Sequence, residues 1–320
     1  MLRRRLVAAV AMATIVSLWP APAPRAEEPL RLVLGTATPG GGFPAYGEAL
    51  AASVREASPT LEIELRATTG SNENLTLLRE GKLDLALVQG EYAYEALAAA
   101  GDRSPLAVVA PVYATQGLFV VPASSPIRSI EDLPGRAVAL GTRSSGLTIM
   151  ARTVLRGSGI DPDRGIRPVI LDRAGDGPDL VLDGRAAALW GGGLGWPGFR
   201  KLAAAPGGAR FFGPSPQAIE TILALSPSLR RMTVPAGAFP SQATAIETVG
   251  SWSFIVARPG LDDAAVSRLV RAIDLGRDAL ARRLPQGHDS DPRNLVAAIP
   301  AKWLHPATAS FLREVGAVPR

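Results

Sequence analysis

The chain has 320 residues, and its 34 Lys and Arg against 29 Asp and Glu give a formal net charge of +5. Residues 1–26 hold four arginines and no acid, so the remaining chain has 30 basic and 29 acidic residues, a net of +1. A nearly neutral mature chain lacks the excess of positive charge that attracts the phosphate groups of a nucleic acid. The absence of Cys excludes disulfides, thiolate metal sites and a cysteine nucleophile, and two His argue against a histidine metal site. We therefore expect no metal, no cofactor and no nucleic-acid partner.

The N-terminal segment has the layout of a secretory signal. Arg3 to Arg5 are followed by an apolar run from Leu6 to Trp19 and by a Pro/Ala stretch that ends at Ala26. The run of 14 residues is shorter than the roughly 20 that span a bilayer, so a cleaved signal is favoured over a membrane anchor. We expect residues 1–26 to be a signal peptide cut near Ala26, and the mature protein to be soluble in the periplasm.

The first third of the mature chain alternates strands with helices. A buried type of strand at 30–35 runs into a Gly-rich loop at 36–42, and helical spacing follows at 43–56. The pattern repeats with strands at 61–67 and 83–88 and helices at 71–78 and 91–100. Three such units in sequence predict a parallel sheet covered by helices.

After two further strands, the pattern starts again. The predicted elements are strands at 106–111, 117–122, 137–141, 169–171, 186–190, 209–212 and 245–257, and helices at 147–156, 214–225, 262–284, 294–298 and 308–315. The segment 142–146 is a second polar loop between a strand and a helix, like the loop at 36–42. The long alternating segment 245–257 could cross between domains.

These elements predict an α/β fold with two lobes, each a mostly parallel sheet flanked by helices, joined as a hinged clamshell. The first lobe comprises residues 27–115 and 246–320, and the second comprises residues 116–245. The chain would cross near 113–121 and near 245–255. Ligands of open parallel sheets bind at the carboxyl ends of the strands, where helix N-termini offer N–H donors to an anion.

Motifs that would indicate catalysis fail on inspection. The segment Gly191–Gly195 follows a strand but lacks the spacing of a dinucleotide fingerprint, and there is no phosphate-binding P-loop and no GxSxG elbow. A Ser–His–Asp triad would have to use His288 or His305, for which a structural role is the simpler interpretation. We expect a binding protein rather than an enzyme.

Neutral polar and aromatic residues at the strand ends are the candidates for binding a ligand. For any single Ser, Thr or Asn, helix capping is an equally good explanation, and Trp190 could equally belong to the core. Their joint placement at successive strand ends of both lobes favours binding. The predicted ligand-binding residues are Thr36, Thr38, Gly42, Phe43, Tyr46, Ser71, Asn74, Gln89, Tyr113, Arg143, Ser144, Ser145, Gly146, Trp190 and Gly193.

Five blocks carry a resemblance that spans the mature chain. They are LVLGTATPGGGFPAYGEALA from Leu32, TTGSNENLTLLREGKLDLALVQ from Thr68, IRSIEDLPGRAVALGTRSSG from Ile127, VPAGAFPSQATAIETVGSW from Val234 and LHPATASFLREVG from Leu304. In these blocks the chain resembles the TAXI-type solute receptors of TRAP transporters. The GSNEN segment is the most specific, whereas the DLPG segment also occurs in binding proteins of ABC importers.

The resemblance implies a monomeric periplasmic receptor that binds a small anionic solute and delivers it to the permease subunits of a TRAP transporter. Solutes of that family include dicarboxylates and amino acids. Arg143 is the one cation in a predicted cleft loop, so one hypothesis pairs it with a solute carboxylate, and a solvent-facing Arg is the alternative. Two other interpretations stay open at this point, namely a binding protein of an ABC importer and a periplasmic partner of a membrane sensor.

Overall fold

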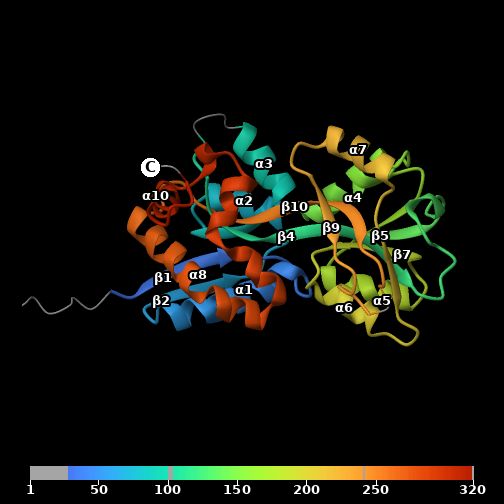
Figure 1. The fold of residues 1–320 in the computed structure, drawn as a ribbon, viewed down its shortest axis with the longest axis horizontal. Helices are drawn as coiled ribbons and strands as arrows, with labels where there is room; N and C mark the ends of the chain where they lie inside the picture. Colours follow the sequence, from blue (N-terminus) through green and yellow to red (C-terminus); the bar gives the residue numbers. More distant parts are fainter. Residues whose placement is uncertain (1–27, 100–103, 241, 319–320) are drawn as a thin grey trace, which may run out of the picture.

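The computed structural model describes residues 28–99, 104–240 and 242–318 as two α/β lobes side by side (Figure 1). The predicted signal peptide lies outside these residues. No helix within them is both long and apolar enough to cross a membrane.

Ten strands form the sheet framework. They are β1 (Leu30–Gly35), β2 (Leu61–Arg66), β3 (Leu85–Gln89), β4 (Ala107–Pro122), β5 (Ala137–Thr142), β6 (Arg167–Leu171), β7 (Ala188–Gly192), β8 (Ala209–Phe212), β9 (Arg230–Val234) and β10 (Ile246–Ala257). The helices are α1 (Gly42–Ala57), α2 (Ser71–Arg79), α3 (Gly90–Ala99), α4 (Gly146–Gly157), α5 (Gly177–Leu182), α6 (Pro197–Ala203), α7 (Pro216–Leu225), α8 (Asp263–Arg283), α9 (Leu295–Ala298) and α10 (Pro306–Glu314). Short 3₁₀ turns include η3 (Ala174–Asp176), η4 (Pro285–Ser290) and η5 (Pro292–Asn294).

Each lobe contains a trio of parallel strands. In the first lobe β1 lies between β2 and β3, and in the second β5 lies between β6 and β7. The long strands β4 and β10 lie between the two trios and run antiparallel to their neighbours, so the sheet as a whole is mixed. The expected clamshell of two α/β lobes is therefore observed, with antiparallel strands at its centre.

The strand β4 differs from the prediction, which split it into 106–111 and 117–122. Residues 107–116 pair with β10, and residues 117–122 pair with β7 and β8 of the second lobe. The intervening residues stay extended because Ala114, Thr115 and Gln116 lie opposite residues 250–252 of β10. One continuous strand thus serves both lobes. The sequence analysis also missed β9, which pairs with the start of β10.

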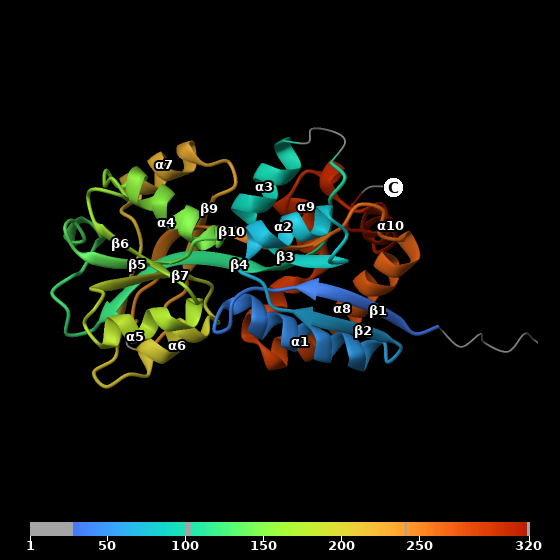
Figure 2. The same ribbon diagram turned by 180° about the vertical axis from the view of Figure 1, so that it is seen from behind.

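Helices cover both faces of the sheet in each lobe (Figures 1 and 2). In the first lobe α1 and α8 lie on one face, and α2 and α3 lie on the other; in the second lobe α5 and α6 lie opposite α4 and α7. Four clusters of buried apolar side chains fill the spaces between sheet and helices, one for each covered face. The burial of these faces supplies the main stabilisation of each lobe.

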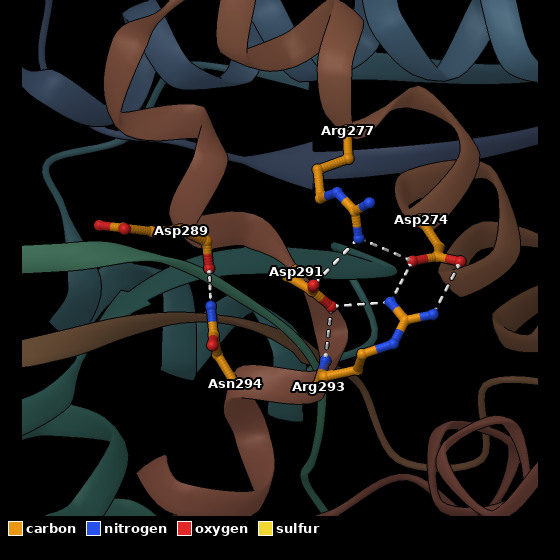
Figure 3. A network of polar contacts seen from close by, with 6 residues as sticks. All are labelled: Asp274, Arg277, Asp289, Asp291, Arg293 and Asn294. Atoms are coloured by element: carbon orange, nitrogen blue, oxygen red, sulfur yellow. Dashed lines mark hydrogen bonds and ion pairs between the residues drawn. The ribbon is translucent and has the colours of Figure 1, made fainter. Parts of the chain in front are cut away.

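A network of charged residues fixes the segment 285–294 against α8 (Figure 3). Arg293 contacts Asp274 at 2.5 Å and Asp291 at 2.9 Å, and Arg277 contacts the same Asp291 at 2.9 Å. Burial raises the pKa of Asp291, but hydrogen bonds from Arg293 and the charges of both arginines outweigh this effect and hold it below its usual range. The segment is thereby held in place to contact β4.

Asn74 ties the first parallel trio together from α2. Its side-chain amide donates hydrogen bonds to the carbonyl oxygens of Thr36 and Leu87, each at 2.8 Å, and the side chain is completely buried. These two carbonyls belong to the chain just after β1 and to β3, so one amide satisfies backbone groups of neighbouring strands. An unsatisfied buried carbonyl costs about 1–3 kcal/mol.

We predict that Asn74→Ala lowers the free energy of unfolding by about 2 kcal/mol, because the Leu87 carbonyl loses its side-chain donor and the Thr36 carbonyl keeps only the hydroxyl of Thr68, at 3.1 Å. Chemical denaturation measures the change. The matched control is Asn72→Ala on the exposed side of the same helix, for which we expect a change within about 0.5 kcal/mol. Equal stabilities of the two variants would contradict the role assigned to Asn74.

Candidate functional site

A cavity of about 70 Å³ lies between the lobes. Residues at or just after the carboxyl ends of all six strands of the two parallel trios line it, which is the place where open α/β sheets bind ligands. The long strands β4 and β10 add Tyr113, Thr115 and Ser253 to the floor. The complete lining is Ala37, Thr38, Gly41, Gly42, Phe43, Thr69, Gly70, Ser71, Gln89, Tyr113, Thr115, Gly141, Thr142, Ser145, Leu147, Leu171, Ala174, Trp190, Gly192, Trp196 and Ser253.

Three helices point their N-termini at this cavity. The first residues of α1 and α2, and Ser145 before α4, line its wall. The first N–H groups of a helix have no partner within the helix, and the helix dipole places partial positive charge there. Neither α1 nor α4 has an acidic residue in its first turn. The three N-termini therefore suit an anion.

The helix α2 has an acidic residue, Glu73, in its first turn, but this carboxylate is bonded to Thr69 of the preceding loop. Glu73 accepts hydrogen bonds from the backbone N–H of Thr69 at 2.6 Å and from the Thr69 hydroxyl at 2.7 Å. These bonds lower the pKa of Glu73, so it is ionised at neutral pH and holds the loop before α2. This loop supplies Thr69 and Gly70 to the cavity wall.

Aromatic side chains form much of the remaining wall. The Tyr113 ring contacts Tyr46 edge to face, with ring centres 5.5 Å apart, and Phe43 at 6.2 Å. Trp190 packs on Phe119 of β4 at 4.7 Å. Burial raises the pKa of Tyr113, so its phenol stays neutral and can donate a hydrogen bond.

Hydrogen bonds between the lobes close the cavity. Trp196 Nε1 donates to the Gly40 carbonyl at 3.2 Å, and Ala174 N donates to Thr38 Oγ1 at 3.2 Å. On another side, Asn72 N donates to the Ser144 carbonyl at 3.4 Å. Behind Tyr113, Gly195 N donates to Gln286 Oε1 of η4 at 2.6 Å. The structure thus shows a closed arrangement of the two lobes.

The cavity wall carries no charge. None of the lining residues listed above is Lys, Arg, Asp, Glu or His. Polar groups of the wall are hydroxyls, backbone N–H groups, the Gln89 amide and the indole nitrogens. Gln89 Nε2 and Trp190 Nε1 are buried donors without a hydrogen-bond partner.

Several of the predicted ligand-binding residues meet at this cavity. They are Thr38, Gly42, Phe43, Ser71, Gln89, Tyr113, Ser145 and Trp190. Ser71 Oγ accepts a hydrogen bond from Gln89 N at 3.1 Å, and its hydroxyl proton remains for another acceptor. Ser145 Oγ caps α4 by accepting from Leu147 N at 3.2 Å. Their role in ligand binding stays a prediction.

The other predicted residues do not line the cavity, and the structure gives most of them a supporting role. Thr36 Oγ1 donates to the Arg66 carbonyl at 3.1 Å, and Asn74 holds backbone carbonyls as described above. The Tyr46 hydroxyl lies 2.9 Å from Ser290 Oγ of η4, behind Tyr113. Gly193 adopts a positive φ of 82° at the turn after β7.

Two of these residues support the loop before α4. The Ser144 carbonyl accepts the hydrogen bond from Asn72, and Gly146 lets α4 approach Gln89, since a Cβ there would lie 2.8 Å from Gln89 Cβ. Arg143 in the same loop is exposed and does not line the cavity. The loop that contains Arg143 reaches the cavity at Ser145, whereas the Arg143 side chain is exposed to solvent.

Other lining residues were absent from the prediction. Thr115 of β4 and Ser253 of β10 are diagonal neighbours on adjacent strands, with their hydroxyl oxygens 3.4 Å apart. Their contribution depends on the pairing of two strands far apart in sequence, which no local motif reveals. By contrast, Leu171, Ala174 and Gly192 lie at or just after the carboxyl ends of strands, as the predicted residues do. They could therefore have been predicted from the place where open α/β sheets bind ligands.

Glu91 is a buried acid close to the cavity, at the start of α3. Ser251 Oγ of β10 donates to Glu91 Oε2 at 3.1 Å, while Oε1 has no partner. Burial raises the pKa of Glu91 to about 7, although hydrogen bonds from its own backbone N–H and from Ser251 lower it in part. The nearby Gln89 side chain also lowers the pKa of Glu91, although the two side chains do not form a well-aligned hydrogen bond. Glu91 is therefore substantially neutral up to about pH 7.

The raised pKa of Glu91 predicts that the protein loses stability as the pH rises. The folded state keeps the proton that the unfolded state releases near pH 4.5, so the stabilisation is complete below that pH and disappears as the pH passes about 7. We expect Glu91→Gln to remove this loss and to be more stable than the unmodified protein at pH 8, by roughly 3 kcal/mol at most. Unfolding at pH 5, 6, 7 and 8 measures it, and parallel pH profiles of the two proteins would contradict the assignment.

The exposure of Arg143 predicts that its charge does not hold the solute. We expect Arg143→Ala to bind carboxylates with an affinity within about twofold of the unmodified protein, because an exposed charge contributes little through solvent. Titration calorimetry provides the comparison, and a loss of tenfold or more would restore the pairing hypothesis.

No group of His, Asp and Glu that could hold a metal ion occurs among the residues for which the structure gives a placement. Such a group would comprise three or more of these side chains close together.

Comparison with known proteins identifies a sequence family and a fold. The model of the NMT1-like family matches residues 34–316. Among solved structures, MatC from Rhodopseudomonas palustris with bound malate is 15% identical with a TM-score of 0.58, covering 89% of this chain and 96% of that one. A putative L-cystine ABC transporter protein from Listeria monocytogenes is 14% identical with a TM-score of 0.50, covering 82% and 98%.

The same fold also occurs outside transport proteins. OxyR from Corynebacterium glutamicum bound to H₂O₂ is 13% identical with a TM-score of 0.53, covering 82% of this chain and 68% of that one. At such low identities the likeness shows a common two-lobed fold and does not transfer a ligand.

Proposed function

Since this chain belongs to the NMT1-like family, we propose that it is an extracytoplasmic solute receptor that binds a small carboxylate between its lobes and delivers it to a membrane transporter. The observation that carries this proposal is the cavity at the carboxyl ends of both parallel trios, with three helix N-termini at its wall. Helix N-termini are ready-made sites for carboxylates. The family model supports the assignment over 34–316.

The proposed transporter is of the TRAP type, on the strength of the resemblance of the GSNEN and LHP blocks to TAXI receptors. An ABC importer is the second candidate, since a putative L-cystine ABC transporter protein shares the fold. The gene neighbourhood separates them: a fused permease with many spans supports TRAP, and an ATPase gene supports ABC.

Three further sequence predictions belong to this proposal. They are export by a signal peptide at 1–26, a monomeric mature protein in the periplasm, and lobes divided at residues 115/116 and 245/246. A receptor role rather than catalysis fits a wall of hydroxyls, amides and aromatic rings, in which no nucleophile is paired with a base among the lining residues.

The test is a thermal-shift screen of the purified protein with small carboxylates, followed by solution scattering. A ligand that binds only the folded state, present at 100 times its Kd, stabilises it by about 2.7 kcal/mol, so we expect the Tm to rise by about 5 °C. The radius of gyration should decrease at saturating ligand, because the solute stabilises the closed lobes. Absence of any shift across the library would contradict the carboxylate class.

The hydrogen bond from Trp196 to Gly40 provides a variant for the same experiment. Trp196→Phe keeps the ring but removes one bond between the lobes, which is worth about 0.5–1.5 kcal/mol. We expect a threefold to tenfold weaker affinity. Trp303→Phe is the matched control, because Trp303 is also buried but lies in the core of the first lobe, away from the cavity.

A further inference from the structure

We infer that the solute is a short monocarboxylate with an apolar body, and that this cavity excludes dicarboxylates and amino acids. The inference rests on the proposed receptor function and narrows its ligand class. Three observations carry it: the uncharged wall, the separation of the wall into a polar and an apolar side, and the buried donors without partners.

Because the wall has no charged side chain, it limits the number of charged groups that a bound solute can have. An α-ammonium group enclosed here would need an anionic partner, and the lining residues include no Asp or Glu. An unpaired charge taken out of water costs several kcal/mol. A single carboxylate can be compensated by helix N-termini without any cation, whereas a second carboxylate would need a second such site.

The donors are concentrated on one side of the cavity. The N-termini of α2 and α4 meet there, since Asn72 N bonds to the Ser144 carbonyl and Gly146 lies against Gln89. Ser71, whose hydroxyl keeps a free proton, begins α2. Both helices lie on the same face of the sheet (Figure 2). This side would hold the single carboxylate.

The opposite side is mainly aromatic. Phe43 and Tyr113 belong to the apolar cluster beneath α1, and Trp196 belongs to the cluster beneath α6. Gly42, at the start of α1, lies between them, because a Cβ there would be 2.7 Å from the Tyr113 hydroxyl and 4.0 Å from Trp196 Cδ1. The N-terminus of α1 therefore lies beside Tyr113 and Trp196, and their rings in the space next to it favour an apolar body over a second carboxylate.

The indole N–H of Trp190 is a donor whose contact with the solute can be tested. Its indole nitrogen is buried without a partner, and the side chain lines the cavity within the cluster that includes Met150 of α4. A buried donor without a partner costs about 1–3 kcal/mol. A carboxylate oxygen from the solute would provide the missing acceptor.

The experiment compares matched ligands by titration calorimetry on the purified protein. Butyrate is paired with succinate, which adds a second carboxylate, and 4-methylpentanoate is paired with leucine, which adds an ammonium group. We expect each monocarboxylate to bind at least tenfold more tightly than its partner. Succinate or leucine binding as tightly as its partner would overturn the inference and leave the receptor function intact. If none of the four compounds, nor any other carboxylate, binds, both the inference and the carboxylate receptor fail.

A second measurement locates the bound carboxylate. Trp190→Phe retains the ring and removes the N–H donor, so we expect the affinity for the better monocarboxylate to fall about tenfold, as for a hydrogen bond to a charged group. The matched control is Trp303→Phe, which removes an equally unpartnered buried N–H outside the cavity, and it should leave the affinity unchanged. An equal effect of both variants, or no effect of Trp190→Phe, would overturn the placement.

Discussion

The antiparallel pairing of β4 with β10 is the constraint on which the rest of the structure depends. Each strand is long because it pairs with strands of both lobes, β4 with β10 and β7, and β10 with β3 and β9, and residues of each line the cavity. Their pairing fixes the distance between the parallel trios and brings the carboxyl ends of those trios to face each other. A site made from six strand ends and three helix N-termini follows from that single arrangement.

The segment around η4, in the C-terminal part of the chain, also contacts β4 and helps to hold it in place. It is held on α8 by the Arg293 and Asp291 contacts and reaches β4 through Asp289, whose carboxylate accepts a hydrogen bond from Ala114 N at 3.1 Å. Ser290 supports Tyr46, and Gln286 reaches across to Gly195 of the second lobe. The aromatic wall is therefore supported from behind by a segment that does not itself line the cavity.

The sequence predicted most elements and several of the strand-end residues that line the cavity, because alternating strands and helices leave a clear periodic signal. It failed where a contact depends on strands distant in sequence. The continuous β4 and the contact between Thr115 and Ser253 are examples, since neither carries a local motif. It also could not separate Ser71, which lines the cavity, from Asn74 in the same segment, which is turned toward backbone carbonyls. The side on which a helical residue lies becomes clear only when the helix is packed.

The contacts between the lobes described above pair no two charges, since the charged Arg230 of β9 reaches α3 at the neutral Tyr94 hydroxyl, 3.3 Å away. The bonds from Trp196 to Gly40, from Ala174 to Thr38 and from Gly195 to Gln286 join uncharged groups. Ionic strength screens interactions between charges and acts little on such bonds. The balance between open and closed lobes should therefore stay nearly constant when the salt concentration of the surroundings changes.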